Sequence, residues 1–206
     1  EQMAADYMSN YFKNIGIPPY KDSTYYQNIP LEQRSIENAT IKINETQYKF
    51  KKDFYTYPNF SQTEITSNEI IFLGYGIDTK NYTDYNTNVK GKVILVFNGE
   101  PKDEQGNYLV SKGTEKCPES SWRFKLNKAK EKGAGAVLFV TENLTKEYEK
   151  VEHKINHPGV SLTKKEEPIP FFYISKNMAN NILGKNKVEK YKKKIKSKKR
   201  SFNKVV

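Results

Sequence analysis

The stretch Gly91-Lys92-Val93-Ile94-Leu95-Val96-Phe97-Asn98-Gly99 decides the fold of this 206-residue chain. Its five central residues form a continuous apolar run between turn residues, and such a run is typical of a strand buried on both faces. A second apolar run, Ala136 to Val140, follows a segment with helical spacing. Strand, helix and strand in this order predict a parallel pair joined by a right-handed crossover.

The segment between the two runs carries helix signals. Trp122, Leu126 and Ala129 recur at helical spacing and share one face. Ser121 stands just before them, where a hydroxyl group can cap a helix, and Gly133 ends the pattern. We therefore expect a helix between the two buried strands.

Weaker patterns predict the remaining elements. Helices are expected over residues 1–14, where apolar side chains recur every three or four positions, and over residues 176–183, which Gly184 ends. Gly74-Tyr75-Gly76 predicts a turn. Strand character is present in five further runs, namely Tyr25 to Gln27, Ala39 to Ile43, Tyr48 to Phe50, Glu69 to Tyr75 and Phe171 to Ile174.

Positive charge is concentrated at one end of the chain. Residues 185–206 contain 11 basic residues and one acidic residue, whereas the preceding 184 residues contain 24 basic and 23 acidic residues. Val188, Tyr191 and Ile195 recur at helical spacing, which favours a helix with a solvated lysine face packed by one apolar edge. The alternative is a tail that binds an anionic partner, either a nucleic acid or a membrane surface. Nucleic acid is not expected, because the tail offers few aromatic side chains for base stacking.

Composition excludes several classes of protein. The aromatic content of 13% argues against disorder, and the single cysteine, Cys117, forbids an internal disulfide. No apolar run approaches the 18 residues of a membrane span. The chain does not begin with methionine and shows no signal peptide, so we interpret it as a processed or excised piece.

The two histidines are poor candidates for a metal site. His153 and His157 have the spacing that places two ligands on one helical face. Lys154 breaks the His-Glu-x-x-His pattern, and Pro158 disfavours a helical conformation at His157. We expect both histidines in a solvated loop and no metal ligand in this chain.

No catalytic residue is predicted either. Cys117 has no histidine base nearby in the sequence, so a bystander thiol is expected. The adjacent carboxylates Asp103-Glu104 and Glu166-Glu167 are surrounded by lysines and are typical of surface charge.

A set of motifs nevertheless follows a known pattern. The set comprises Gly74-Tyr75-Gly76-Ile77, Tyr82-Thr83-Asp84-Tyr85, Val89 to Val96, Gly99-Glu100-Pro101, Trp122 to Val140 and Ile169 to Leu183. These motifs resemble the protease-associated (PA) domain that is inserted in two-zinc aminopeptidases of the leucyl-aminopeptidase and transferrin-receptor type. Ala4 to Phe12 resembles the first helix of those peptidases.

The resemblance implies an α+β fold, a three-layer β/β/α PA-type domain with a mixed sheet or open barrel, plus an N-terminal helix. It divides the chain into a peptidase-like front segment (residues 1–60), the PA domain (61–184) and a lysine-rich tail helix or end of the PA domain (185–206). It also implies an extracytoplasmic location, whether periplasmic, secreted or surface-anchored.

The function implied by the resemblance is that of a non-catalytic accessory domain. The family's His-x-Asp pair, bridging Asp, Glu-Glu pair and further His belong to a core that would follow Val206. Zinc is therefore expected in that core, with no cofactor in this chain, and this chain alone is predicted to be inactive. Its partners would be a peptide substrate or the peptidase core, because PA domains shape access to the active site or mediate protein contacts.

Two groups of residues are predicted to make such contacts. The loop from Glu100 to Ser121 is long for a connector, and Tyr108, Trp122 and Arg123 are the candidates there for contact with substrate or core. The alternative for Trp122 is burial beneath its helix. The apolar face of the first helix, formed by Met8, Phe12 and Ile15, is expected to pack on a neighbouring chain, giving self-association, or on the PA sheet.

Overall fold

A computed structural model of the chain describes residues 2–20, 24–61, 64–163, 167–198 and 202–206. The chain forms two compact units, one of residues 1–33 and 160–164 and a larger one of residues 34–159 and 165–206. Within the described ranges, every helix is too short or too polar to span a bilayer.

The smaller unit contains helix α1 (Gln2–Asn14) and a two-stranded antiparallel pairing of β1 (Leu31–Glu32) with β8 (Ser161–Leu162). The predicted first helix is thus confirmed. None of its residues is buried. Met8 in the helix is 45% exposed, and Ile15 directly after the helix is 52% exposed. The packing of its apolar face on another surface stays a prediction.

The strand expected at Tyr25 to Gln27 does not form. Instead, the phenol groups of this segment make side-chain hydrogen bonds within the smaller unit. The Tyr25 hydroxyl donates to the Ile17 carbonyl (2.7 Å), and the Tyr26 hydroxyl donates to the Asp6 carboxylate (2.7 Å). The two tyrosines therefore stabilise this segment through their side chains. A tyrosine-rich run is also typical of a strand, so the sequence alone could not distinguish the two cases.

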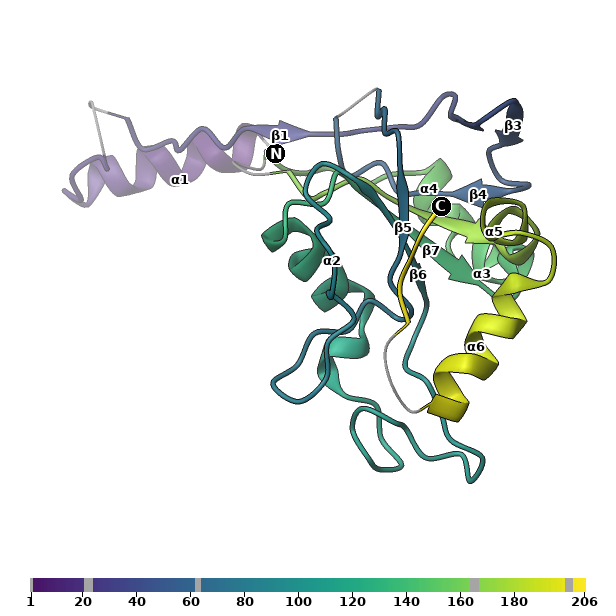
Figure 1. The fold of residues 1–206 in the computed structure, drawn as a ribbon. Coiled ribbons are helices and arrows are strands. Elements are labelled where there is room, and N and C mark those ends of the chain that lie inside the picture. The colour runs from purple at the N-terminus through teal and green to yellow at the C-terminus, as the bar shows by residue number, and fades with distance from the viewer. Residues whose placement is uncertain (1, 21–23, 62–63, 164–166, 199–201) are drawn as a thin grey trace. The chain divides into compact units, whose positions relative to one another are not determined.

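The larger unit is built on a six-stranded mixed sheet in the order β10-β5-β6-β7-β9-β4 (Figure 1). The four inner strands are parallel, and the two edge strands are antiparallel to them. The predicted parallel pairing of the two buried runs is confirmed, as is a mixed sheet in an α+β fold. The strands are β4 (Phe54–Tyr55), β5 (Ile70–Phe72), β6 (Val93–Phe97), β7 (Ala136–Thr141), β9 (Phe171–Ser175) and β10 (Lys204–Val205).

Side chains of the inner strands feed two apolar clusters on opposite faces of the sheet. In β6, Leu95 and Phe97 join one cluster, whereas Ile94 and Val96 join the other, and all four are at most 1% exposed. This alternation is the reason why the run carries no polar residue. The deciding stretch is therefore buried on both faces, as expected.

Helices cover both faces. α2 (Trp122–Glu131), α3 (Leu144–Glu149) and α4 (Glu152–Asn156) contribute to the cluster of Ile94 and Val96. α5 (Lys176–Leu183) and α6 (Lys187–Lys198) contribute to the cluster of Leu95 and Phe97. The hairpin of β2 (Thr40–Ile43) and β3 (Thr46–Lys49) packs on this second cluster. A short 3-10 helix, η1 (Pro118–Ser120), precedes α2.

Two local predictions need correction. Ser121 occupies the N-cap position of α2, but its side chain makes no capping hydrogen bond. The strand expected over Glu69 to Tyr75 ends at Phe72, because the chain turns through Gly74 and Gly76 with φ angles of +61° and +65°. A Cβ atom at Gly76 would lie 2.7 Å from Cγ1 of Val96, so both conformation and space require glycine there.

Gly76→Ala should therefore destabilise the larger unit more than Gly91→Ala. Both positions have positive φ, but Gly91 has no atom within 4 Å of the added Cβ atom. Conformational strain alone should cost Gly91→Ala about 1 kcal/mol, and overpacking should add about 1–3 kcal/mol at Gly76. Urea unfolding measures both. Equal losses of unfolding free energy in the two variants would show that the Val96 side chain moves aside without destabilising the fold.

Candidate functional site

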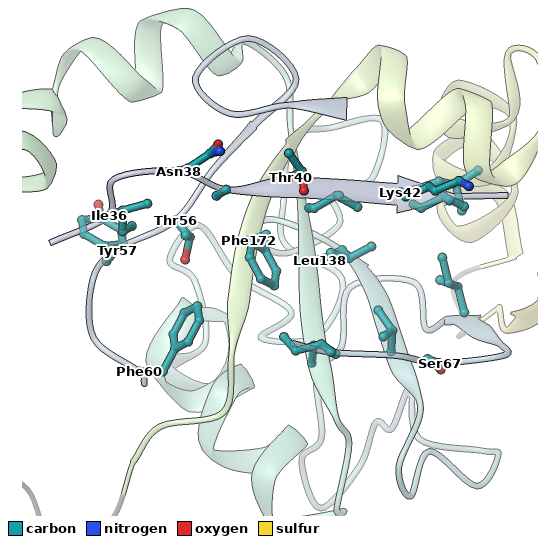
Figure 2. A pocket seen from close by; sticks show the side chains of 18 of the residues that line it. Ile36, Asn38, Thr40, Lys42, Thr56, Tyr57, Phe60, Ser67, Leu138 and Phe172 are labelled. Carbon is teal, nitrogen blue, oxygen red and sulfur yellow. The ribbon is translucent and has the colours of Figure 1, made fainter. Parts of the chain in front are cut away.

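The larger unit contains an open groove with a volume of about 1010 Å³, which we call the β2 groove (Figure 2). Leu138 of β7 and Phe172 of β9 lie on the sheet face that forms its floor. Its sides are β2 with the residues before it (34–39), and residues 56–61 and 65–70. The volume is in the range of small-molecule and peptide sites.

β2 gives one side of the groove an apolar lining. Ile41 and Ile43 are half-buried against the core, whereas Thr40 and Lys42, which alternate with them, are exposed. This alternation follows from the two-residue repeat of a strand. The groove therefore has apolar side chains on both its floor and its β2 side.

The backbone of β2 also has an unpaired edge. Among the described residues, β2 pairs only with β3, through the two-residue connection Asn44-Glu45. In such a hairpin Ile43 and Thr46 form a hydrogen-bonded pair, and pairs alternate along the ladder. Thr40 and Lys42 therefore direct their N–H and C=O groups away from β3. Groups of this kind can pair with an added strand.

A carboxylate joins two sides of the groove. Glu167 accepts hydrogen bonds from the N–H and hydroxyl groups of Ser61 (2.8 and 2.6 Å) and forms an ion pair with Arg34 (2.8 Å). The hydrogen bonds from Ser61, followed by those of Arg34, lower the pKa of Glu167 to about 2. The junction is therefore intact at neutral pH. Glu167 is a partly exposed surface charge, as predicted, but its pairing with Ser61 and Arg34 was not foreseen; Glu166 lies outside the described residues.

The charges that line the β2 groove largely cancel. Of the four described charged residues that line it, Arg34, Lys42 and Glu69 form ion pairs with residues outside the lining, and Glu37 is an exposed acid. The groove consequently carries little net charge. The pairs are Arg34 with Glu167, Lys42 with Glu45 (3.6 Å), and Glu69 with Lys92 (2.5 Å).

The long loop before α2 is folded around a buried carboxylate. Glu100 is 6% exposed, and its carboxylate accepts hydrogen bonds from the N–H groups of Val110 (2.9 Å), Ser111 (2.8 Å) and Cys117 (2.8 Å). Three charge-assisted bonds to backbone amides fix the loop far more strongly than its polar sequence suggests. Sequence reasoning missed this role, because the three partners lie 10 to 17 residues away.

Two ionisable side chains in and beside this loop have shifted pKa values: Lys125, which is buried, and Cys117, which is half-buried. The Lys125 ammonium group donates to the carbonyls of Phe97 (3.1 Å) and Gly99 (2.6 Å), and burial lowers its pKa to about 7. Burial and the neighbouring Glu100 raise the pKa of the Cys117 thiol to about 11. The thiol is therefore protonated at neutral pH, a form that is a poor nucleophile.

The structure joins two of the three predicted contact residues. Trp122 is half-buried and stacks on Phe171 (5.6 Å between ring centroids), and the Arg123 guanidinium group lies 4.9 Å from the Trp122 ring. Tyr108 makes no described contact with either of them; its ring instead faces the Lys102 ammonium group at 4.4 Å. None of the three lines the β2 groove.

The expected loop position is confirmed for His157 but was wrong for His153. His153 is part of α4, His157 follows its end, and their exposed rings stack with centroids 4.7 Å apart. Within the described ranges, no three His, Cys, Asp or Glu side chains are grouped closely enough to hold a metal ion.

Comparison of the chain with protein-family models, with curated proteins and with solved structures returned no match.

Replacing Glu100 with alanine should destabilise the larger unit by about 3 kcal/mol, because three backbone N–H groups lose a charged acceptor. The exposed Glu104 is the matched control, and Glu104→Ala should change stability by less than about 0.5 kcal/mol. Urea unfolding gives the free energies. Limited proteolysis of residues 101–117 should accelerate in the Glu100 variant only, and equal proteolysis of both variants would contradict the role of Glu100.

Lys125 should make stability depend on pH. Its folded-state pKa of about 7 lies below the ordinary lysine pKa of 10.5, so the unfolded chain binds more protons between these values. The free energy of unfolding should then rise from pH 7 to pH 9, by at most about 1.4 kcal/mol per pH unit for one proton. Lys125→Met should remove this rise, whereas Lys80→Met, at an exposed site, should retain it. An unchanged slope in Lys125→Met would contradict the assignment.

Proposed function

We propose that this chain is a non-catalytic, peptide-binding accessory module of the PA type, which holds an extended peptide segment in the β2 groove. The observation that carries the proposal is the combination of an apolar groove of about 1010 Å³ with an unpaired strand edge beside it. Strand addition supplies main-chain hydrogen bonds, and alternate side chains supply apolar contacts.

The groove favours a ligand with uncharged side chains. Leu138 and Phe172 on the floor and Ile41 on the side offer apolar surface. Three of the four charged residues in the described lining already form ion pairs, so a charged ligand residue would gain little there. The bound segment is expected to present small or branched apolar side chains at every second position.

The resemblance to PA domains supplies the wider context of the proposal. The peptide would be a substrate of a zinc aminopeptidase-like protein or a segment of its catalytic core, outside the cell's cytoplasm. Catalysis and zinc would belong to that core. The exposed apolar side chains of Met8 in α1 and of Ile15 directly after it would contact the core or a second chain.

The proposal predicts binding of a capped, uncharged heptapeptide in which valine and threonine alternate. Titration followed by ¹H–¹⁵N NMR should shift the amide signals of residues 36–43 and 65–70. Thr40→Pro removes one N–H group that points away from β3, and it should weaken binding at least about tenfold. Thr40→Val keeps that group and should bind as the unaltered chain does.

Two results would overturn the proposal. One is the absence of shifts at the groove residues with peptide at about 1 mM, the weak limit of specific recognition. The other is zinc-dependent, chelator-sensitive release of amino acids from peptides by the purified chain, since this would make the chain itself catalytic.

A further inference from the structure

Helix α6 presents a lysine-rich surface that is separate from the β2 groove. We define the lysine face as Lys187, Lys190, Lys193, Lys196 and Lys198. None of these five side chains forms an ion pair with a described residue. Three of them, Lys190, Lys193 and Lys198, are exposed.

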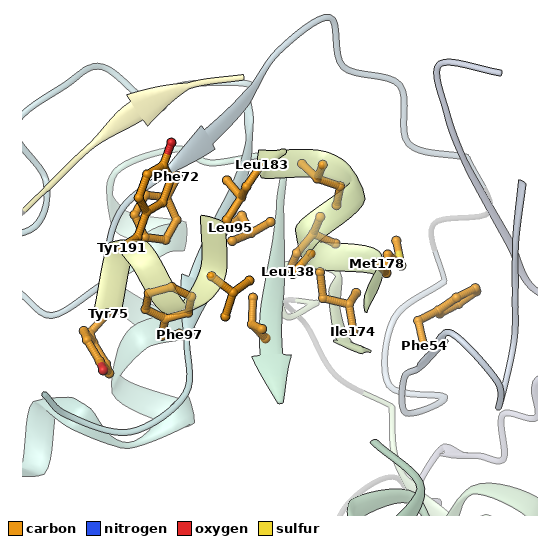
Figure 3. Packing of buried hydrophobic residues seen from close by; sticks show 14 of the residues in the cluster. Phe54, Phe72, Tyr75, Leu95, Phe97, Leu138, Ile174, Met178, Leu183 and Tyr191 are labelled. Carbon is orange, nitrogen blue, oxygen red and sulfur yellow. The ribbon is translucent and has the colours of Figure 1, made fainter. Parts of the chain in front are cut away.

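The helix that carries these lysines is firmly anchored. Val188, Tyr191 and Ile195 are at most 5% exposed, and Tyr191 packs against Phe72 with ring centroids 5.2 Å apart (Figure 3). Because the apolar edge of α6 is fixed to the sheet, its lysines project from a rigid rod about 18 Å long. Their arrangement therefore belongs to the fold and not to a flexible tail.

The charge on α6 is not that of an ordinary solvated surface. Solvated surfaces mix both signs, as residues 1–184 do with 24 basic and 23 acidic side chains. α6 has seven lysines and one acid, and that acid, Glu189, pairs with Lys176 of α5. Among the lysines of α6, Glu142 forms an ion pair with Lys192 only, within the described residues. The lysine face therefore has a positive electrostatic potential, which no unpaired acidic side chain among the described residues of α6 balances.

We propose that the lysine face of α6 binds membrane surfaces rich in anionic lipid head groups. Lysine ammonium groups on flexible stems act as point charges, which suits a diffuse negative surface, and clusters of four to eight such charges bind anionic bilayers. A nucleic acid fits less well, because the nearby aromatic rings are not free to stack on bases. Tyr191 is buried, and the Phe202 ring is covered by the Lys194 ammonium group at 3.5 Å.

The experiment is cosedimentation of the whole chain with phosphatidylcholine vesicles that contain about one third phosphatidylserine. Binding should be lost on pure phosphatidylcholine and at about 0.5 M salt. The triple variant Lys190→Gln, Lys193→Gln, Lys198→Gln should bind about 100-fold more weakly, since each lysine near an anionic leaflet contributes about fivefold. These three side chains are exposed, so thermal unfolding should be unchanged.

The matched control removes the same charge elsewhere. Lys80, Lys116 and Lys154 are exposed, form no described ion pair and lie outside α6. Their triple glutamine variant should bind vesicles within about threefold of the unaltered chain. Equal losses in both variants would show a response to net charge alone and overturn the proposal. Tighter binding to single-stranded RNA than to the vesicles at the same salt would also overturn it.

Discussion

Burial of the strand pair β6–β7 on both faces is the constraint on which the larger unit depends. Alternate side chains of Val93–Phe97 enter two separate apolar clusters, so the sheet is stable only when both faces are covered. α2, α3 and α4 cover one face. α5, α6 and the β2–β3 hairpin cover the other, and the β2 groove lies where this second cover is incomplete.

The same constraint explains which parts of the fold could be predicted. The run Val93–Phe97, the helix that Gly133 ends and the run from Ala136 carry their signals within a few residues, and each formed as expected. The strand prediction for residues 25–27 was wrong because a tyrosine-rich run also occurs where phenol groups form side-chain hydrogen bonds. The predicted strand from Glu69 was too long. The apolar pattern continues to Tyr75, but the positive φ angle of Gly74 turns the chain before that residue.

The contacts of the candidate site could not be predicted from the sequence, because they join residues that are far apart in the chain. Glu167 and Ser61 are 106 residues apart, and nothing local at either position indicates that they meet. Glu100 lies nearer to its partners but binds their backbone N–H groups, which every non-proline residue possesses. Trp122 and Arg123 lie together because they are neighbours on a helix, whereas Tyr108 shares only a loop with them and contacts Lys102 instead. Contact of the three residues with a substrate or core stays a prediction.

The chain uses lysine in two opposite ways, and the contrast links the two proposals. Lys125 is buried, where two carbonyl groups hold its ammonium group against the end of β6. The lysines of α6 are kept outside by an apolar edge that packs on the cluster of Leu95 and Phe97. Leu138 on the floor of the β2 groove belongs to the same cluster, so groove and lysine face lie on one side of the sheet. A module anchored through α6 would therefore hold its peptide on the side of the sheet that faces the membrane.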